Sequence, residues 1–428
     1  MNTNELRIGI ASLAQDGRGV GRVDGRVCFV EGGLPGETVL ARVVREKPSM
    51  LEAVTIAVES ASPARCQPVC PETRCGGCAL RAMEYQAQLA EKRRIVEEQL
   101  ARIGKIPEPK VLPMVGMEDP FGYRNRVRLV WDGACLVFRA RQSHESGGRI
   151  AFCRIASPEV VRLACAVEDC LREGLIRIDR ECEVLVRFGV EGYVGFEGAR
   201  PARVSAEAAG RLQDAGAAVL DVGGQRADLM RQDPDGEYLP DVEYRVGGMT
   251  FAVKGRSFFQ TNIRMAERLF RDVLDILGSD SRGTVIDLYG GVGAPGLLCA
   301  REGRTVLSVE IDPDAVRAAT FNATRAGVAY QAIGGDAARV LPGLLTRFPR
   351  ADLVVDPPRA GLSGEVVAAL VAHPPERIIM ISCDPATLAR DAGRLTADGT
   401  YVLEYLRPYD MFPWTHHSEA LAVFVRRP

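Results

Sequence analysis

The chain has 428 residues, 46% of them hydrophobic and 26% charged, and its 54 Lys and Arg against 56 Asp and Glu give a net charge of −2. This length predicts about two to four domains, and a charged fraction near the roughly 25% of globular proteins excludes disordered and fibrous classes. No apolar run reaches the ~18 residues of a membrane span, and residues 1–15 lack the apolar centre of a signal peptide. We therefore expect a cytoplasmic protein, with no membrane association, whose 12 cysteines are core, metal-binding or catalytic residues rather than disulfides.

Residues 5–60 have the pattern of a small all-β unit. Short β-prone runs at 6–13, 26–30, 38–45 and 52–58 are separated by turn residues such as Asp16-Gly17 and Pro35-Gly36. About five strands in so short a segment predict a small barrel of the oligonucleotide-binding kind. The pattern alone is equally compatible with another small β module.

The next segment departs from this pattern. Residues 63–80 combine three prolines, two adjacent glycines and four cysteines, and a helix is predicted over 85–103 from apolar residues at helical spacing. Residues 115–250 are again mostly β-prone, with one helical stretch near 158–173. From about residue 262, helices alternate with short apolar strands at 284–287, 305–310, 353–356 and 378–382. This alternation predicts a parallel sheet with crossover helices.

A glycine-rich turn follows the first of these strands. Asp287 is followed by Leu-Tyr-Gly-Gly-Val-Gly, the next strand ends at Glu310, and Asp336 follows a pair of glycines. Glycines there let a ligand approach the backbone, and a carboxylate at the end of the second strand can hold ribose hydroxyls. The order favours S-adenosylmethionine (SAM) over a nicotinamide cofactor. A plain structural turn is the alternative.

Two further strand ends carry reactive residues. Asp356 begins an Asp-Pro-Pro-Arg run, and Cys383 ends the following strand beside Asp384. Ligands bind at this edge of open α/β sheets, so the position favours a nucleophile over ordinary packing for Cys383. Methylation of carbon 5 of uracil requires such a thiolate to add at carbon 6 and a base to remove the carbon 5 proton. Glu419 is the candidate base, with a solvated loop carboxylate as the alternative.

Four cysteines, Cys66, Cys70, Cys75 and Cys78, crowd into 13 positions. Cytoplasmic cysteines at this density predict a metal site, and both zinc and iron–sulfur clusters accept four thiolates. Spacing does not choose between them. It does exclude the C-x3-C-x2-C pattern of radical-SAM enzymes, because four residues separate the second and third cysteines.

Arginines provide the candidate RNA contacts, although the net charge indicates no polyanionic partner. Residues 1–150 carry 22 Lys and Arg against 18 Asp and Glu, an excess of four. If residues 123–129 form a strand, Arg124, Arg126 and Arg128 share one face and suit phosphate binding. Arg18 and its neighbours Arg22 and Arg26 would be the loop contacts of the barrel.

Several motifs together resemble the SAM-dependent RNA uridine-C5 methyltransferases, specifically the branch with an N-terminal TRAM domain and an iron–sulfur cluster. The similarity covers essentially the whole chain and is carried by Asp-Gly-Arg-Gly-Val at 16–20, Phe-Phe-Gln-Thr-Asn at 258–262, the glycine turn at 287–293, Asp-Pro-Pro-Arg at 356–359, the segment 382–391 and the segment 412–419. The family often has Cys where this chain has Gly290, and Asn where it has Ala294.

The resemblance implies a role for each matching residue. It implies Cys383 as the nucleophile and Glu419 as the base that takes the carbon 5 proton. The implied SAM-binding residues are Gln260, Tyr289, Glu310, Asp336 and Asp356. The implied ligands of a 4Fe-4S cluster are Cys70, Cys75, Cys78 and Cys153, with Cys66 as the substitute for Cys70 because the first gap is one residue shorter than usual. The remaining cysteines, Cys28, Cys135, Cys165, Cys170, Cys182 and Cys299, have apolar neighbours and are expected to pack.

The expected fold is therefore multidomain. A TRAM-like, OB-like β-barrel occupies residues 1–60, a central and mostly β iron–sulfur and RNA-binding domain takes 63–80 and 116–254, and a Rossmann-like α/β methyltransferase domain takes 81–115 and 255–428. The expected protein is a monomer that methylates 23S ribosomal RNA.

Three alternatives stay open. The first is a transfer-RNA uridine-C5 methyltransferase, and the second is an amino-group RNA methyltransferase, which would have no use for Cys383 or Glu419. The third is an iron–sulfur RNA-binding protein without catalysis.

Overall fold

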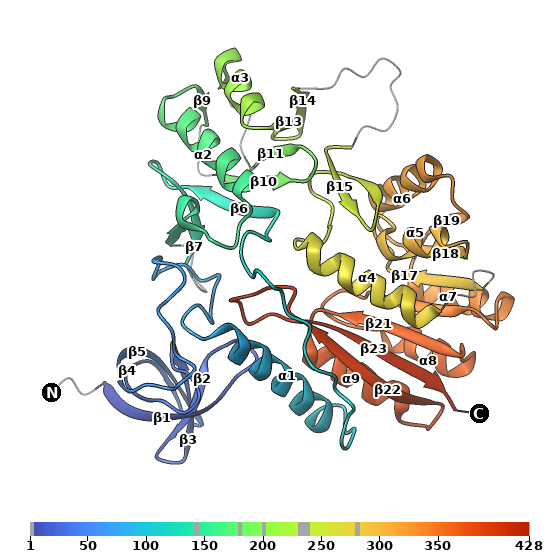
Figure 1. Cartoon of the computed structure of the whole chain (residues 1–428), viewed down its shortest axis with the longest axis horizontal. Coiled ribbons are helices and arrows are strands. Elements are labelled where there is room, and N and C mark those ends of the chain that lie inside the picture. Colours follow the sequence, from blue (N-terminus) through green and yellow to red (C-terminus); the bar gives the residue numbers. More distant parts are fainter. Residues whose placement is uncertain are drawn as a thin grey trace.

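The computed structural model describes residues 4–140, 145–178, 182–198, 203–229, 240–278 and 283–427. Figure 1 shows three parts: a small barrel at the N-terminus, a middle part built on a second sheet, and a larger α/β part that ends the chain. No helix within these ranges is long and apolar enough to cross a membrane.

The N-terminal strands close into a five-stranded barrel in the order β1-β2-β3-β5-β4. They are β1 (Glu5–Leu13), β2 (Gly19–Val23), β3 (Arg26–Glu31), β4 (Thr38–Lys47) and β5 (Met50–Ser60). Alternating apolar residues fill the interior, including Ile8, Ile10, Val30, Val39 and Leu51. The predicted barrel is confirmed.

The middle part is a seven-stranded sheet in the order β14-β13-β11-β10-β6-β7-β8. Its strands are β6 (Arg126–Trp131), β7 (Leu136–Arg139), β8 (Ser146–Arg149), β10 (Glu183–Phe188), β11 (Gly192–Glu197), β13 (Ala217–Val222) and β14 (Gln225–Asp228). The predicted helix near 158–173 is α2 (Pro158–Arg172), which packs on β10. A further helix, α3 (Ala206–Asp214), was not predicted because it is short and lies within a β-prone region; Ser205 Oγ caps it by accepting from Ala208 N at 3.0 Å.

Smaller elements complete the middle part. They are the 3-10 turn η1 (Ile150–Phe152) and the strands β9 (Ile176–Arg177), β12 (Arg203–Val204), β15 (Val242–Val246) and β16 (Met249–Val253). β15 and β16 form a separate hairpin that leads toward the α/β part.

The C-terminal part is a seven-stranded sheet in the order β19-β18-β17-β20-β21-β23-β22. The strands are β17 (Thr284–Leu288), β18 (Thr305–Glu310), β19 (Tyr330–Gly334), β20 (Asp352–Val355), β21 (Arg377–Ser382), β22 (Tyr401–Tyr409) and β23 (Glu419–Arg426). The first five are mutually parallel, as predicted, and β22 and β23 add an antiparallel hairpin.

Helices cover both faces of this sheet. They are α4 (Ile263–Leu277), α5 (Ala294–Arg301), α6 (Pro313–Ala326), α7 (Ala337–Arg347), α8 (Gly364–Ala372) and α9 (Pro385–Thr396), joined by α1 (Tyr85–Arg102) from earlier in the chain. Val285 faces α4 to α6, whereas Ile286 faces α1 and α7 to α9. The carboxyl ends of the parallel strands therefore meet at one edge, where ligands of such sheets bind.

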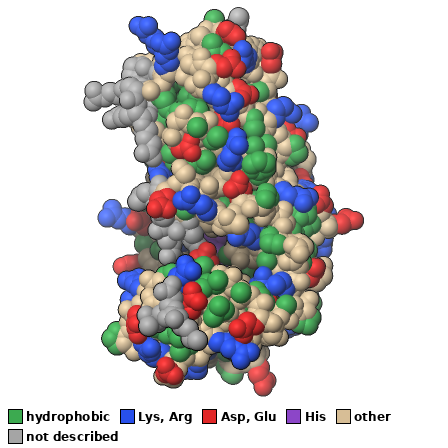
Figure 2. Space-filling model, turned by 90° about the vertical axis from the view of Figure 1, so that its left-hand side faces the viewer, with side chains coloured by type: hydrophobic (Ala, Val, Ile, Leu, Met, Phe, Trp, Pro, Cys, Tyr) green, Lys and Arg blue, Asp and Glu red, His purple; other side chains and the backbone are tan. Residues whose placement is uncertain are grey.

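Figure 2 shows the side of the molecule formed by the barrel and the middle part. Lys and Arg side chains are interspersed with Asp and Glu on this face, and a hollow lies between its lower and upper parts. This face therefore presents mixed charge around a depression rather than one extended basic field.

Candidate active site and cysteine cluster

The glycine turn after β17 is organised around Glu310. Glu310 Oε2 accepts a hydrogen bond from Gly291 N at 3.0 Å, and its Oε1 accepts from Ile311 N and Asp312 N, both at 2.8 Å. Tyr289 adopts a positive φ of 62° at the start of the turn. These bonds fix a carboxylate beside exposed backbone, an arrangement that suits a nucleoside ribose.

A buried carboxyl lies beneath this turn. Asp287 is fully buried, its Oδ2 accepts from Ser308 Oγ at 3.2 Å, and its Oδ1 has no hydrogen-bond partner. Burial raises the pKa of Asp287 to about 7, and the carboxylates of Asp356 and Glu310 add to the rise. A Cβ at Gly290 would collide with Ser308 Oγ, so Ser308 excludes the cysteine that the resembling family often has there.

The other predicted SAM-binding residues come from three elements. Asp336 is exposed and caps α7, with Oδ1 accepting from Ala338 N at 2.8 Å. Burial and then the Asp336 carboxylate raise the pKa of Tyr289, so these two side chains are electrostatic neighbours. Gln260 is buried in the segment before α4, where its backbone carbonyl accepts a hydrogen bond from Asn125 Nδ2 at 3.0 Å. Asp287 and Ser308 lie beneath the glycine turn and were not among the predicted residues, although Asp287 begins the motif.

Cys383 and Glu419 meet at the carboxyl edge of the sheet. Cys383 directly follows β21, Glu419 is the first residue of β23, and the two strands pair side by side, with Ser382 opposite Ala420. Burial raises the pKa of the Cys383 thiol to about 11, the Glu419 carboxylate adds to the rise, and the Arg359 guanidinium opposes it. The predicted nucleophile and base are thus neighbours in space, although 36 positions separate them in the chain.

Two further side chains share this site. Burial, followed by the Asp356 carboxyl, raises the pKa of Glu419 well above its ordinary value, while Arg359 lowers it. Burial also raises the pKa of Asp356 to about 7. The Arg359 guanidinium is therefore close enough to act on both the thiol and the Glu419 carboxyl. Arg359 was not predicted as a site residue, although the Asp-Pro-Pro-Arg motif placed it at the right edge.

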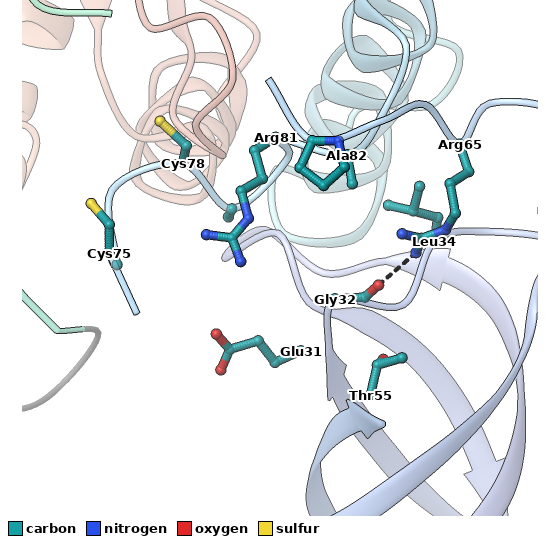
Figure 3. Close-up of a pocket in the computed structure, with 12 residues that line it drawn as sticks. Glu31, Gly32, Leu34, Thr55, Arg65, Cys75, Cys78, Arg81 and Ala82 are labelled. Carbon is teal, nitrogen blue, oxygen red and sulfur yellow. Dashed lines mark hydrogen bonds between the residues drawn. The ribbon is translucent and has the colours of Figure 1, made fainter. Parts of the chain in front are cut away.

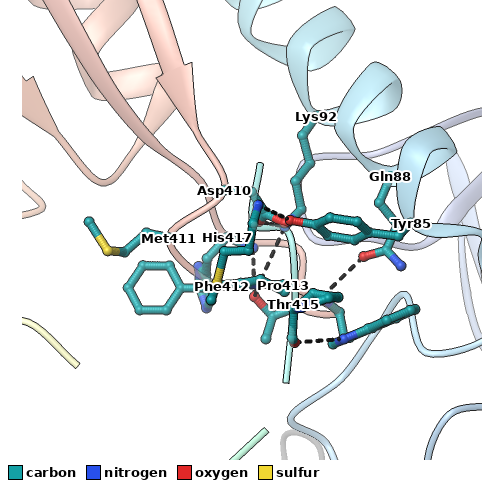
Figure 4. Close-up of polar contacts among 12 residues, drawn as sticks. Tyr85, Gln88, Lys92, Asp410, Met411, Phe412, Pro413, Thr415 and His417 are labelled. Carbon is teal, nitrogen blue, oxygen red and sulfur yellow. Dashed lines mark hydrogen bonds and ion pairs between the residues drawn. The ribbon is translucent and has the colours of Figure 1, made fainter. Parts of the chain in front are cut away.

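The loop that leads to Glu419 is held by α1, as Figure 4 shows. Lys92 Nζ donates to Asp410 Oδ1 at 2.6 Å and to the carbonyl of Phe412 at 3.2 Å. The Lys92 and Asp410 side chains are 2% and 0% exposed, so this is a buried ion pair. Gln88 Oε1 accepts from Trp414 N at 3.1 Å on the same helix face. The base is thus presented by a loop anchored to a helix more than 300 positions away.

The middle part and the cysteine segment (residues 63–80) also form hydrogen bonds with this loop. Tyr123 Oη donates to the carbonyl of Pro413 at 2.9 Å, and Trp414 Nε1 donates to that of Pro120 at 3.0 Å. Leu80 N, two residues after Cys78, donates to the carbonyl of Trp414 at 2.9 Å.

His417 precedes Glu419 by two positions on this loop. Burial lowers the pKa of His417 to about 3, with His416 and Arg359 contributing. The imidazole is therefore neutral near pH 7.

Three of the clustered cysteines and the distant Cys153 line one cavity. Cys70, Cys75, Cys78 and Cys153 surround it, with Val69, Phe138 and Ile155 as apolar walls. Burial raises the pKa of Cys78 to about 12, with Cys153 as the next contributor. A Cβ at Gly148 would lie 2.7 Å from Cys75 Cβ, so Gly148 allows the backbone to approach.

This arrangement is not a ready metal site. Within the described part of the chain, no three His, Cys, Asp or Glu side chains are grouped so that they could hold a metal ion. Cys66 does not line the cavity. The predicted iron–sulfur cluster stays a prediction.

The predicted RNA-contacting arginines are largely engaged within the protein. Burial raises the pKa of Cys78 and of Cys153, and Arg124 opposes the rise in both, which places its charge beside the cysteine cavity. On β6, Arg128 pairs with Glu183 at 3.0 Å and Glu197 at 3.3 Å. Burial, followed by the charge of Arg187 on the neighbouring strand, lowers the pKa of Arg126 to about 10.

The three barrel arginines have partners of their own. Arg18 pairs with Asp16 at 2.7 Å and lies over the Phe29 ring, and Arg26 pairs with Glu46 at 2.6 Å. Arg22 donates to the carbonyl of Gly25 at 3.1 Å.

The cysteines expected to pack are buried at Cys28, Cys170, Cys182 and Cys299, and half-buried at Cys135 and Cys165.

Two family models match the chain. A model described as tRNA (Uracil-5-)-methyltransferase matches residues 336–427, and a TRAM domain model matches residues 1–56. A protein named as an uncharacterised RNA methyltransferase of Halalkalibacterium halodurans is 33% identical over 99% of this chain and 97% of its own length. Another so named, from Nitratidesulfovibrio vulgaris, is 32% identical over 99% of this chain and 96% of its own.

One solved structure is similar over the whole chain. It is the tRNA (uracil-54, C5)-methyltransferase of Pyrococcus abyssi in complex with S-adenosyl-L-homocysteine. The match has a TM-score of 0.75 and 25% identity, and it covers 98% of this chain and 99% of the other. The barrel, the middle part and the α/β part are thus all shared with that protein.

Proposed function

Because the chain belongs to the family of SAM-dependent RNA (uracil-5)-methyltransferases, we propose that it methylates carbon 5 of a uridine in RNA through Cys383 and Glu419. The observation that carries this mechanism is the adjacency of the two side chains at the ends of β21 and β23. A lone buried cysteine or a lone buried glutamate would have a packing explanation. A thiol beside a carboxyl of raised pKa, at the ligand-binding edge of this sheet, matches the chemical need for a nucleophile and a base.

The reaction starts with the Cys383 thiolate adding to carbon 6 of the uracil ring. The electrons of the ring double bond move to carbon 5, which then attacks the methyl group that SAM supplies. Glu419, ionised at that stage, removes the carbon 5 proton, and elimination releases the Cys383 thiolate and restores the double bond. Arg359 stabilises the anionic thiolate and any negative charge on the pyrimidine edge.

The residues around the glycine turn suit SAM binding. Glu310, already oriented by three backbone N–H groups, would hold the ribose hydroxyls, with Tyr289 and Asp336 beside the base. The unpartnered Oδ1 of Asp287 offers a buried anionic contact below the turn, suited to the ammonium group. Gln260 and Asp356 complete the proposed set.

The mechanism is tested with two substitutions that separate its steps. Cys383→Ala should abolish 5-methyluridine formation, because it removes the thiol that adds to carbon 6 in this mechanism. Glu419→Gln should allow addition and methyl transfer but block release, so a covalent protein–RNA adduct should accumulate on denaturing gels. Arg350→Gln, an exposed arginine away from the site, is the control. Normal 5-methyluridine yield from Cys383→Ala, measured by mass spectrometry of nucleosides, would refute the mechanism.

Two RNAs are candidates. The combination of a TRAM barrel with the cysteine cluster supports 23S ribosomal RNA, through the resemblance described above. Transfer RNA is supported by the Pyrococcus abyssi tRNA (uracil-54, C5)-methyltransferase, which matches this chain over 98% of its length, barrel included. The barrel therefore does not discriminate between the two.

A methyl-transfer assay decides between them. Unmodified transcripts of 23S ribosomal RNA and of transfer RNA are incubated separately with the protein and with SAM labelled in the methyl group. We expect label in the ribosomal transcript, mapped to one or a few uridines, and none above background in the other. Label in transfer RNA alone would assign the enzyme to that substrate.

For the cysteine cavity, we propose a 4Fe-4S cluster on Cys70, Cys75, Cys78 and Cys153. The convergence of the four thiols on one apolar cavity supports it, and Arg124 offsets part of the negative charge. Such a cluster would supply a crosslink between the segment 69–81 and the end of η1. Anaerobically purified protein should contain iron and sulfide, Cys78→Ala should lose both, and Cys66→Ala should keep them. A colourless protein that contains zinc would refute the proposal.

The remaining expectations are part of the same proposal. We propose that the enzyme acts in the cytoplasm as a monomer, in the three-domain division stated above. Light scattering during size-exclusion chromatography gives the mass to compare with the 46.4 kDa of one chain.

A further inference from the structure

One turn of the N-terminal barrel reaches the proposed nucleophile. The turn 14–18 joins β1 to β2, and Gln15 Nε2 donates a hydrogen bond to Asp384 Oδ2 at 3.0 Å, across 369 positions of sequence. Asp384 directly follows Cys383. The barrel thus contacts the side chain of the residue that follows the thiol.

Asp384 uses each carboxylate oxygen differently. Its Oδ1 caps α9, accepting from Ala386 N at 3.0 Å and from Thr387 N at 2.9 Å, while Oδ2 accepts from Gln15. Ser382 Oγ accepts from Asp384 N at 3.3 Å and closes the turn from the other side. The orientation of residues 382–384 is therefore fixed by the helix cap from within and by Gln15 from the barrel.

A glycine allows this close approach. Gly17 has a φ of 79°, and a Cβ added to it would lie 2.9 Å from Ala79 Cβ and 3.0 Å from His416 Cβ. Ala79 follows Cys78, and His416 lies on the loop that leads to Glu419. The same barrel turn therefore contacts three segments: the turn 382–384 around Cys383, the loop 410–418 that leads to Glu419, and the cysteine segment 63–80.

The barrel is not packed evenly against its neighbours. Figure 3 shows a cleft between the barrel and the cysteine segment, with the side chains of Glu31 and Arg81 pointing into it from opposite sides. Cys75 and Cys78 lie on its wall. Beside this cleft, Leu13 and Leu34 of the barrel pack against Leu80 and Met83, so the turn 14–18 lies next to an apolar contact between the two parts.

We propose that Gln15 is a positioning residue for the methylation reaction: through Asp384 it holds the Cys383 backbone where the thiol can reach carbon 6 of the uridine. This inference rests on the proposed role of Cys383. It gives the barrel a part in the chemistry beyond RNA binding. Loss of the amide donor leaves Asp384 Oδ2 without its partner, and a misplacement of about 1 Å at a reacting group costs up to ~100-fold in rate.

The decisive measurement follows the steps up to methyl transfer and leaves out the final elimination. With SAM present, RNA that carries 5-fluorouridine should form a stable methylated adduct with Cys383, because fluorine replaces the carbon 5 proton that the base would have to remove. Gln15→Glu keeps the size of the side chain, removes the donor and places a carboxylate against Asp384. We expect the adduct to form about 10- to 100-fold more slowly at saturating RNA, with the Kd values for RNA and SAM within twofold of wild type. Gln15→Ala should slow it in the same direction but less.

The controls separate this role from others. Arg7→Ala, on the outer surface of the same barrel, should leave the rate unchanged. Thermal melting reports whether the variants fold; Gln15 is half-buried, so we expect unchanged melting temperatures. An unchanged adduct rate, or a weaker RNA affinity with an unchanged rate at saturation, would overturn the positioning role. A wild-type protein that forms no adduct at all would instead refute the proposed function.

Discussion

At the residue scale, the charge state of Cys383 depends on its neighbours. The thiol pKa of about 11 means that almost all molecules carry a neutral thiol near pH 7, because burial and Glu419 disfavour the anion. Arg359 is the side chain that favours the thiolate. Replacing Arg359 is therefore the most direct way to change the pKa of Cys383 through charge.

Replacement of Arg359 by Gln should raise the pKa of Cys383 further. A rise of one in the pKa reduces the thiolate fraction about tenfold and slows the alkylation of Cys383 by iodoacetamide at pH 9 in the same proportion. The pH profile of the alkylation should move to higher pH. Peptide mass mapping follows the Cys383 peptide alone. Arg359→Lys should restore part of the rate and Arg350→Gln should have no effect. An unshifted profile for Arg359→Gln would contradict the argument.

Asp287 predicts a pH dependence of stability. Its folded pKa of about 7 lies above the ordinary 3.8, so the folded protein binds more protons than the unfolded chain between these values. The free energy of unfolding therefore falls as pH rises from about 4 to 7, by about 4 kcal/mol at most from this group. Asp287→Asn should reduce the change in melting temperature between pH 5 and pH 8. The change that remains should come from Asp356 and Glu419. Parallel profiles for the two proteins would contradict this assignment.

At the scale of elements, α1 and the 410–418 loop act as one unit. The predicted helix supplies Lys92 and Gln88 to a loop that lies at the other end of the chain. A loop leading to the predicted base would otherwise be mobile, and these buried contacts make it part of the rigid core.

Lys92→Met should destabilise the protein strongly. It leaves Asp410 buried without its cation, which costs about 3–5 kcal/mol, whereas removing both charges in Lys92→Met/Asp410→Leu should restore much of the loss. Urea unfolding measures both. Glu97→Ala, which breaks the exposed Arg93–Glu97 pair on the same helix, should cost under about 1 kcal/mol. Equal losses for the single and double variants would contradict this view of the pair.

At the scale of the whole molecule, one buried carboxylate helps to hold the barrel against the segment that follows it. Glu37 is fully buried and accepts from Arg65 Nε at 2.5 Å and Arg65 Nη2 at 2.7 Å, and from Leu34 N at 2.8 Å. Arg65 belongs to the segment that leaves the barrel. The ion pair therefore sets the direction in which the barrel meets the catalytic part.

Arg65→Met should loosen this attachment. The Glu37 carboxylate would lose its cation while it stays buried, so we expect a loss of about 2 kcal/mol or more and faster hydrogen exchange in barrel amides than elsewhere. Arg7→Ala, which removes a surface pair whose side chains are 73% and 39% exposed, is the matched control. Uniform exchange across all three parts of Arg65→Met would show that the barrel does not depend on this pair.

Local patterns were enough for much of the fold and for the chemical groups. Strand alternation and turn glycines predicted the barrel, the alternation of helices and short apolar strands predicted the parallel sheet, and strand ends marked Glu310, Asp356 and Cys383. These features depend on residues close together in the chain. The short helix α3 was missed because so few residues carry a weak periodic signal.

The sequence by itself therefore determined the family and predicted the cofactor motif and the type of nucleophile, since each motif is a run of neighbouring residues. Only the tertiary structure decided which distant groups share a site: Arg359 between Cys383 and Glu419, Lys92 beneath the base loop, and Gln15 against Asp384. It also decided that Arg124 and Arg128 serve partners inside the protein. Contacts between segments hundreds of positions apart leave no local signature, because any donor of the right reach satisfies them once the chain has folded.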